Sequence, residues 1–247
     1  MSNEWHTGLV ARRGRRGVLK EVHAMKVAII GAGNVGTALA TALTRAGHNV
    51  TITARDPLHA TKAAEQSGAS TAPSNAAAAG SADVVIAAVP ATSIREVAAD
   101  IRQPASGKPV VDVTNRMAPT DQGLDIDTSS SNAEDLASML PASSVVKAFN
   151  TLFASNQADP TAEGVQLDGF VAADDEAAKA AVIELIESIG LHPVDVGPLK
   201  RARQLEGLAF LNITLNAENG GSWQSGWKLV GAPETTGSDT TERGSAE

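Results

Sequence analysis

The sequence predicts an α/β fold with a doubly wound parallel sheet and a short C-terminal helical segment. Short apolar runs typical of buried strands alternate with helical segments from Met25 to about residue 216. This alternation places parallel strands side by side, with helices on both faces of the sheet. A glycine-rich turn joins the first strand to the first helix, at Gly31, Ala32, Gly33, Asn34, Val35 and Gly36. Its G-x-G-x-x-G spacing between strand and helix is the pattern of a dinucleotide-binding Rossmann fold.

Each glycine of this turn has its own task in such a site. Gly31 permits the tight turn, Gly33 lets the backbone approach a pyrophosphate, and Gly36 lets the helix pack on the strand. The N-terminus of the helix adds free N–H groups and the positive end of the helix dipole. We therefore expect the phosphates of a dinucleotide at this turn.

The remaining elements follow in order along the chain. The first strand covers residues 27–30, and the first helix runs from residue 37 to about 46, where Gly47 forms its C-cap. Apolar runs predict further strands at 48–53, 83–90, 108–113, 144–149, 169–173 and 192–196. Helical spacing predicts helices at 58–66, 92–101, 132–140, 174–189 and 200–216, and a short helix or turn at 76–79. Polar residues and turn formers predict a loop near the ligand at 117–130.

The composition excludes several classes of function. The chain has 247 residues, 43% hydrophobic and 19% charged, with a formal net charge of -8. No apolar run approaches the ~18 residues that span a bilayer, so we expect a soluble, cytoplasmic protein without a membrane partner. The acidic charge disfavours nucleic acid as a partner. The absence of cysteine and tyrosine excludes disulfides, thiolate nucleophiles and a Tyr–Lys proton relay, and the histidines show no metal-ligand spacing.

The end of the second predicted strand indicates which dinucleotide binds. NAD-binding sites carry an acidic residue there for the ribose 2′-OH, whereas this strand ends with Thr53 and is followed by Ala54 and Arg55. A guanidinium binds a phosphate bidentately, so we expect Arg55 at the 2′-phosphate of NADP, with the Thr53 hydroxyl and His59 as further partners. Asp56 either pairs with Arg55 or faces a 2′-OH.

These patterns divide the chain into four parts. Residues 1–24 form a basic extension that we expect to be disordered, and residues 25–197 form the NADP-binding domain. Residues 198–231 are a helical segment closing a second pocket, and the Thr/Ser/Gly/Glu-rich residues 232–247 are an expected disordered tail. The helical segment is too short for its own core, so it packs on the sheet domain or on a second subunit. A homodimer is the hypothesis.

The sequence offers no clear group for proton transfer. Lys147 lies toward the end of a predicted strand, where it is either an acid or an anchor for a phosphate or carboxylate. Asp112 and Asp195 lie in predicted strands, where we expect them to bind backbone groups or cap loops. A site poor in acids and bases favours direct hydride transfer between two ring cofactors, which carry the chemistry while the protein orients them.

Several stretches resemble the family of NADP oxidoreductases that use the deazaflavin coenzyme F420. They are the glycine turn, Thr53-Ala54-Arg55, Ala88-Val89-Pro90, the stretch 145–151 (Val-Val-Lys-Ala-Phe-Asn-Thr) and the stretch 195–206 (Asp-Val-Gly-Pro-Leu-Lys-Arg-Ala-Arg-Gln-Leu-Glu). The resemblance covers roughly residues 25 to 230, and the last two stretches are its most specific part. Some family members have a histidine where Asn150 stands.

This resemblance implies a homodimer that passes hydride between NADPH and F420. It places Ala32 to Val35 at the pyrophosphate, and Thr53, Arg55 and His59 around the adenosine phosphate. Val89 and Pro90 would lie beside the nicotinamide. The cofactor-binding set is completed by Ala148 and, around a second pocket, by Asn150, Thr151, Pro198 and Leu199. No residue is assigned a catalytic or metal-binding role.

Other hypotheses about the function and the hydride acceptor stay open. The stretch 145–151 is equally similar to the cytoplasmic NADPH–flavin domain of membrane ferric reductases, so FAD, FMN or ferric iron is an alternative acceptor. A non-catalytic NADP sensor and a carbonyl or imine reductase using Lys147 are further alternatives. Trp223 and Trp227 are unusual for the family, and either stack on an acceptor ring or pack against the C-terminal helix.

Overall fold

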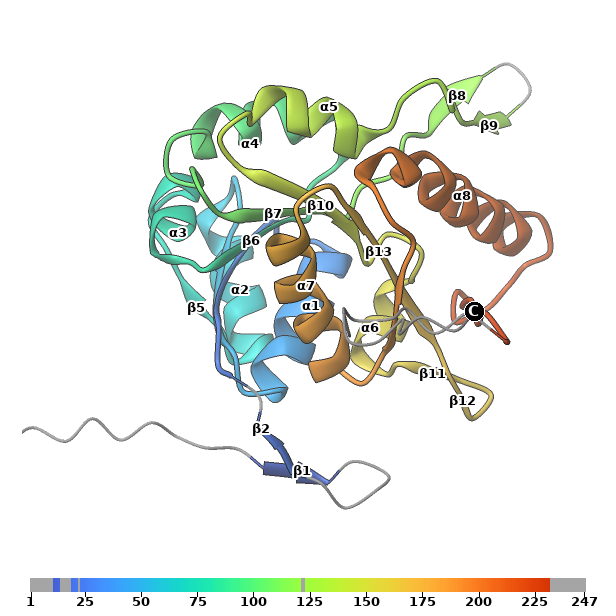
Figure 1. Ribbon diagram of the computed structural model, residues 1–247, viewed down its shortest axis with the longest axis horizontal. Helices are drawn as coiled ribbons and strands as arrows, with labels where there is room; N and C mark the ends of the chain where they lie inside the picture. Colours follow the sequence, from blue (N-terminus) through green and yellow to red (C-terminus); the bar gives the residue numbers. More distant parts are fainter. Residues whose placement is uncertain (1–10, 14–18, 22, 121–122, 232–247) are drawn as a thin grey trace, which may run out of the picture.

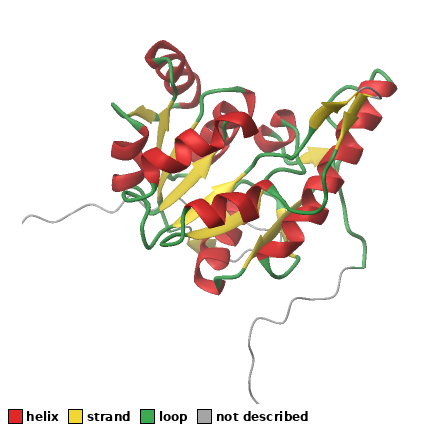
Figure 2. Ribbon diagram, turned by 90° about the horizontal axis from the view of Figure 1, so that it is seen from above, coloured by secondary structure: helices red, strands yellow, loops and turns green. Residues whose placement is uncertain are grey.

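The computed structural model describes residues 11–13, 19–21, 23–120 and 123–231 of the chain. A central sheet crosses the molecule, and helices cover both of its faces (Figure 1 and Figure 2). Within these residues, its eight strands are β3 (Lys26–Ile30), β4 (Asn49–Thr53), β5 (Ser70–Thr71), β6 (Val84–Ala87), β7 (Pro109–Asp112), β10 (Ser144–Ala148), β13 (Asp168–Ala173) and β14 (His192–Asp195). The helices are α1 (Asn34–Arg45), α2 (Pro57–Ser67), α3 (Asn75–Ser81), α4 (Ile94–Ile101), α5 (Asn132–Met139), α6 (Ala154–Ala158), α7 (Glu176–Ser188) and α8 (Ala202–Glu218).

The strands lie in the order β14-β13-β10-β7-β6-β3-β4-β5. All neighbours from β10 to β5 are parallel, which confirms the predicted doubly wound sheet for this part. β13 runs antiparallel to β10 and pairs in parallel with β14, so the sheet is mixed rather than wholly parallel. The connection from β10 to β13 contains α6 and the hairpin of β11 (Thr161–Ala162) and β12 (Val165–Gln166). An antiparallel neighbour needs no crossover helix, so strand–helix alternation does not reveal this reversal.

The side chains of the sheet divide the core into two layers. Val27 and Ile29 of β3 face one layer together with α1, α2 and α7. Ala28 and Ile30 face the other layer together with α3, α4, α5 and the first residue of α8. Successive side chains of a strand point to opposite faces. Because both faces are covered, the inner part of β3 is apolar throughout.

Two short hairpins differ from the sequence expectations. In the basic segment 1–24, expected to be disordered, β1 (Ala11–Arg13) pairs antiparallel with β2 (Leu19–Glu21). In the predicted loop 117–130, β8 (Ala118–Thr120) pairs antiparallel with β9 (Gly123–Asp125). Such hairpins need only local backbone pairing, so they leave no extended apolar pattern in the sequence. The other residues up to 22 and the predicted tail 232–247 lie outside the described residues.

The chain after α8 folds back along the edge of the sheet, through residues 220–231, here called the C-terminal strap. Asp168 of β13 fixes it: the backbone N–H of Leu229 donates to Asp168 Oδ2 over 2.6 Å, and Asp168 N–H donates to the Trp227 carbonyl over 3.0 Å. The C-terminal segment therefore packs on the sheet domain. Among the described residues, no helix combines the length and apolar character needed to cross a membrane.

Candidate active site

The glycine turn lies where the carboxyl ends of β3, β4 and β6 meet. Gly31 N–H donates to the Thr53 carbonyl of β4 over 2.8 Å, and its φ is +118°, a region that favours glycine. A Cβ on Gly31 would lie 2.1 Å from the Ala88 carbonyl oxygen, and one on Gly36 would lie 1.9 Å from the Gly31 carbonyl oxygen. A Cβ on Gly33 would meet no atom within 4 Å. Gly31 and Gly36 are therefore required by packing, whereas Gly33 faces open space in front of α1.

A cavity of about 670 Å³ opens beside this turn, here called the first cavity. Seven residues of the predicted cofactor set line it: Gly31, Ala32, Gly33, Arg55, His59, Val89 and Pro90. Thr53 does not; it is buried, and its hydroxyl donates to Asn75 Oδ1 over 2.7 Å. Thr53 therefore holds Asn75, which does line the cavity, rather than facing it.

Charged side chains gather at the end of the first cavity that holds Arg55. Arg55 Nη2 donates to Glu96 Oε2 of α4 over 2.7 Å, an ion pair that the sequence did not predict. Asp56 instead forms the N-cap of α2, since its Oδ1 accepts from Leu58 N–H over 2.9 Å. His59 Nδ1 lies 3.8 Å from Asp56 Oδ2. Asp56 is thus not the partner of Arg55.

A second cavity of about 460 Å³ lies on the other side of the turn. It is lined by Asn34, Val35, Asn115, Asn150, Thr151, Leu152, Phe153, Ala154, Ser155, Ala209, Asn212, Ile213, Ser222, Trp223 and Gln224. Asn34 and Val35 belong to the glycine turn, so the turn separates and borders both cavities. None of these described lining residues carries an ionisable side chain.

Three residues predicted to bind a cofactor are placed elsewhere. Ala148 is fully buried in β10. Pro198 and Leu199 line neither of these two cavities, which corrects the expectation for the second pocket. Leu199 packs in the core layer of α4 and α5, and its N–H donates to Asp174 Oδ1 over 2.9 Å. The turn before α8 therefore anchors that helix to the sheet, and other residues of α8 reach the cavity.

Asn150 offers an unpaired acceptor beside the second cavity. Its Nδ2 donates to Asn115 Oδ1 over 2.9 Å and to the Leu205 carbonyl over 3.0 Å, while its buried Oδ1 has no partner among the described residues. The preceding residue, Phe149, has φ +62°, in the left-handed region that a bulky residue rarely adopts. This strained turn presents Asn150 and Thr151 to the cavity. A buried acceptor without a donor fits a ligand N–H.

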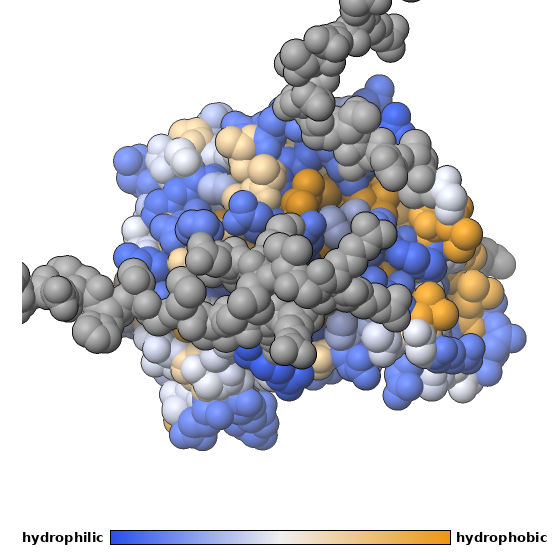
Figure 3. Space-filling view, turned by 60° about the horizontal axis from the view of Figure 1, so that its bottom comes forward, coloured by the Kyte–Doolittle hydropathy of each residue, from blue (hydrophilic) through white to orange (hydrophobic). Residues whose placement is uncertain are grey.

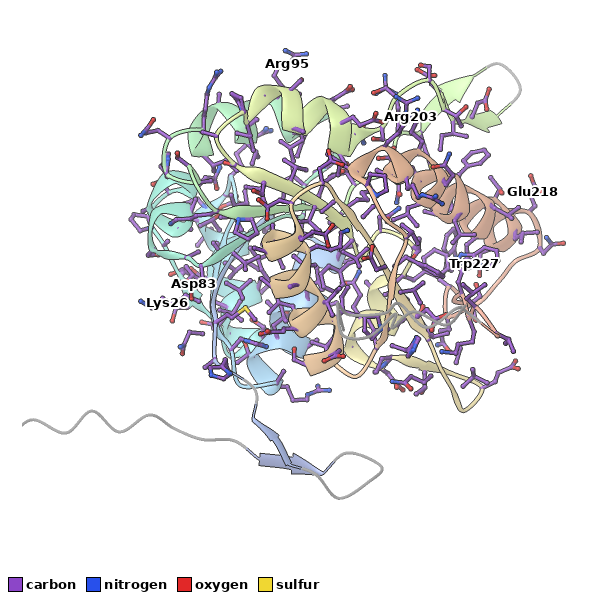
Figure 4. The ribbon with its side chains drawn as sticks, in the orientation of Figure 1. Lys26, Asp83, Arg95, Arg203, Glu218 and Trp227 are labelled. Carbon is purple, nitrogen blue, oxygen red and sulfur yellow. The ribbon has the colours of Figure 1, made fainter. Side chains whose placement is uncertain are left out.

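The C-terminal strap supplies an aromatic corner to the same cavity. Trp223 has φ +57°, and its ring meets that of Phe153 at 76° with centroids 5.2 Å apart. Its N–H donates to Asn216 Oδ1 over 3.1 Å, and its carbonyl accepts from Ser155 Oγ over 2.7 Å. Trp227 behaves differently, because it packs against the small core cluster of β13, β14 and α8 (Figure 4). The two tryptophans thus have separate roles, one at the cavity and one in packing.

Lys147 lies in neither cavity. It is fully buried, and its Nζ donates to Asp112 Oδ2 and to Glu206 Oε1, each over 2.7 Å, and to the Thr114 carbonyl. Burial raises the pKa of the Glu206 carboxyl, against the effect of the neighbouring ammonium. A side chain held in this way does not line either cavity, so the structure gives no support to the hypothesis of a reductase that uses Lys147 as an acid. The anchor interpretation fits, with Asp112 and Glu206 as the carboxylates.

Comparison with known proteins identifies the family. A family model described as "NADP oxidoreductase coenzyme F420-dependent" matches residues 26–116. The F420-dependent NADP reductase of Methanothermobacter thermautotrophicus is 32% identical over 222 residues, which covers 81% of this chain and 92% of that protein. The chain belongs to the F420-dependent NADP oxidoreductase family.

The chain is also similar to a solved structure and to a second group of reductases. A solved structure from Arthrobacter sp. FB24, assigned as an F420-dependent NADP reductase, matches with a TM-score of 0.73 and 31% identity, over 81% of this chain and 96% of that one. The metalloreductase STEAP3 of Rattus norvegicus is 33% identical over 84% of this chain. The chain spans only 42% of STEAP3 and 38% of the STEAP2 proteins. The predicted resemblance to both groups is confirmed.

Several residues that line the two cavities of this family member were not predicted from the sequence. Asn75, Glu96 and Asp100 line the first cavity, and Asn115, Phe153 and Asn212 line the second. One signal was available for part of them, since Asn115 follows β7 and Glu96 lies in the first turn of the helix after β6. Both positions lie near the carboxyl edge of the sheet, where ligands of open α/β folds bind.

Proposed function

We propose that the protein transfers hydride between NADPH in the first cavity and the deazaflavin coenzyme F420 in the second. The observation that supports it best is that one glycine turn borders both cavities, while the second cavity has no ionisable lining residue among those described. Reduction of a carbonyl or imine needs a group that delivers a proton beside the hydride. Hydride transfer between two rings needs orientation and proximity instead.

The residues of the site would divide this work. The glycine turn and α1 hold the pyrophosphate of NADPH, Arg55 binds its 2′-phosphate, and Val89 and Pro90 lie on the nicotinamide side. In the second cavity, the unpaired Asn150 Oδ1 accepts from a ring N–H, and the corner of Phe153 and Trp223 excludes water from one side of the ring. Hydride passes from the reduced nicotinamide to the deazaflavin, and solvent supplies the proton that completes the reduced acceptor.

A homodimer and a cytoplasmic location are parts of this proposal. The outer face of α8 exposes Leu211 and Leu215, each about half accessible. Figure 3 shows hydrophobic atoms gathered on the side of the molecule where α8 and the C-terminal strap lie in Figure 1. Burial of such a face against a second copy would remove apolar surface from water. Sedimentation velocity at micromolar protein is expected to give a dimer, and a monomer would contradict it.

The experiment that tests the function follows the loss of NADPH absorbance with F420, FAD and FMN in separate reactions. Turnover with F420 alone supports the proposal. Turnover with a flavin alone would favour the second candidate, an NADPH-dependent flavin reductase, which the 33% identity to STEAP3 supports. No turnover despite NADPH binding would contradict both and favour a non-catalytic sensor.

A further inference from the structure

We propose that Glu96 weakens the binding of NADPH relative to NADH, because its carboxylate pairs with the Arg55 guanidinium that the 2′-phosphate needs. The inference rests on the proposed use of NADPH at the first cavity. Glu96 lies in the first turn of α4, and Arg55 lies in the loop just after β4, which ends at Thr53. The ion pair therefore joins two elements at the wall of the first cavity. The ion pair has a single contact of 2.7 Å.

Exposure makes this pair easy to exchange. The side chains of Arg55 and Glu96 are 77% and 66% exposed. An ion pair that accessible contributes little to stability, because water screens it and two long side chains lose freedom in forming it. Arg55 can therefore leave Glu96 for a phosphate, which offers a bidentate and doubly charged partner. Glu96 then remains as an unpaired carboxylate near that phosphate.

The other carboxylates that line the first cavity bind partners other than Arg55. Asp56 caps α2 through Leu58 N–H, and Asp100 Oδ2 accepts from Asn75 Nδ2 over 2.9 Å. Among the described residues, Glu96 is the lining carboxylate that pairs with Arg55. Only NADPH must both displace it and tolerate its charge, because NADH carries a neutral 2′-OH that can donate to a carboxylate. Glu96 therefore penalises NADPH relative to NADH.

The test measures the dissociation constants of NADPH and NADH by nucleotide fluorescence, for wild type and for Glu96→Gln. We expect about three- to tenfold tighter binding of NADPH by Glu96→Gln, with NADH unchanged or slightly weaker. The matched control is Glu184→Gln, which removes the same charge from the exposed face of α7. No change for NADPH, an equal change for both nucleotides, or the same change in the control would each overturn the proposal.

A double-mutant cycle tests the exchange of partners itself. If Glu96 acts partly by occupying Arg55, the gain from Glu96→Gln must be smaller in an Arg55→Ala background. Full additivity would overturn the exchange. These readouts need no acceptor, so a failure of F420 turnover leaves them intact. Absence of NADPH binding by the wild type would instead show that the proposed function fails.

Discussion

Lys147 Nζ donates to Glu206 Oε1 over 2.7 Å, in a fully buried contact between the end of β10 and the second turn of α8. The two residues belong to the two stretches, 145–151 and 195–206, that form the most specific part of the resemblance described from the sequence. Glu206 also accepts from the N–H groups of Arg116 and Asn132. The most distinctive sequence signature of this chain is therefore partly structural: it locks α8, which walls the second cavity, to the sheet.

Lys147→Met is expected to destabilise the fold strongly. It leaves the buried carboxylates of Asp112 and Glu206 without their cation, and loss of one partner of a buried ion pair costs about 3–5 kcal/mol. Glu206→Gln keeps an acceptor for Lys147 but presents an amide N–H to the Arg116 N–H, so about 1–3 kcal/mol is expected. Urea unfolding measures both. A Lys147→Met protein with wild-type stability and no turnover would instead restore a catalytic role for this lysine.

Local patterns predicted most of the fold because they report local geometry. The apolar run from Val27 to Ile30, the glycine turn and the end of the first helix beside Gly47 follow from which residues tolerate burial or a positive φ, although the C-cap itself is Ala46 and Gly47 is the next residue. The position of Arg55 at the first cavity follows from its place after β4. These features need no knowledge of distant parts of the chain.

The rest depends on contacts between distant residues. Glu96 meets Arg55 across 41 residues, and Lys147 meets Glu206 across 59. The reversal of β13 depends on a connection without a crossover helix, which apolar spacing does not encode. Leu199 was assigned to the second pocket by position in a motif, whereas its side chain completes the core under α5. A sequence pattern can assign such a residue to a helix, a strand or one of its faces. It does not predict which distant residue it contacts.

Gly33→Ala and Gly36→Ala should have opposite effects. A methyl on Gly36 collides with the Gly31 carbonyl oxygen, so a loss of about 3 kcal/mol or more of stability is expected. A methyl on Gly33 meets no protein atom within 4 Å. It changes only the N-cap of α1, at a cost below about 1 kcal/mol, but occupies the space that the pyrophosphate needs, so NADPH should bind about tenfold or more weakly. Wild-type NADPH affinity in Gly33→Ala would contradict the placement of the pyrophosphate.

Arg55→Ala should weaken NADPH binding by about ten- to a hundredfold and leave NADH nearly unchanged, because charge-assisted bonds to the 2′-phosphate are lost. The matched control is Arg95→Ala. Arg95 is an exposed arginine of α4, next to Glu96 in the sequence, and its side chain points away from the molecule (Figure 4). Nucleotide titrations at constant ionic strength measure both variants. Equal losses for the two nucleotides would remove Arg55 from the 2′-phosphate site.

The two tryptophans of the strap allow a paired test of the second cavity. Trp223→Leu removes one wall of the aromatic corner, so the KM for F420 should rise about tenfold while NADPH affinity and stability change little. Trp227→Leu removes packing against β13 and α8 and should lower stability instead. Steady-state kinetics and urea unfolding separate these effects. An unchanged KM for F420 in Trp223→Leu would place the acceptor ring elsewhere.

Stability should fall at mildly acidic pH because of His48. Its buried imidazole accepts from Met25 N–H at Nδ1 over 3.2 Å and lies 3.0 Å from Ser188 Oγ at Nε2, and burial lowers its pKa from 6.5. Below pH 6.5 the unfolded chain binds a proton that the folded protein resists, so the contribution present above pH 6.5 is lost as the pH falls through the lower, folded pKa. The loss for this one group is at most about 1.4 kcal/mol per pH unit.

His48→Asn isolates this effect, because the Asn side chain keeps an acceptor for Met25 N–H but does not titrate. Urea unfolding between about pH 5 and 7.5, the range in which an imidazole changes charge, should show a shallower loss of stability in the variant than in the wild type. Glu206 acts with the opposite sign, since its raised pKa gives a contribution that is lost as the pH rises. The comparison therefore uses the difference between the two proteins, in which the Glu206 contribution cancels. His23→Asn, which removes an exposed imidazole, serves as the control. Parallel stability curves for wild type and His48→Asn would show that protonation of His48 is not what the folded state resists.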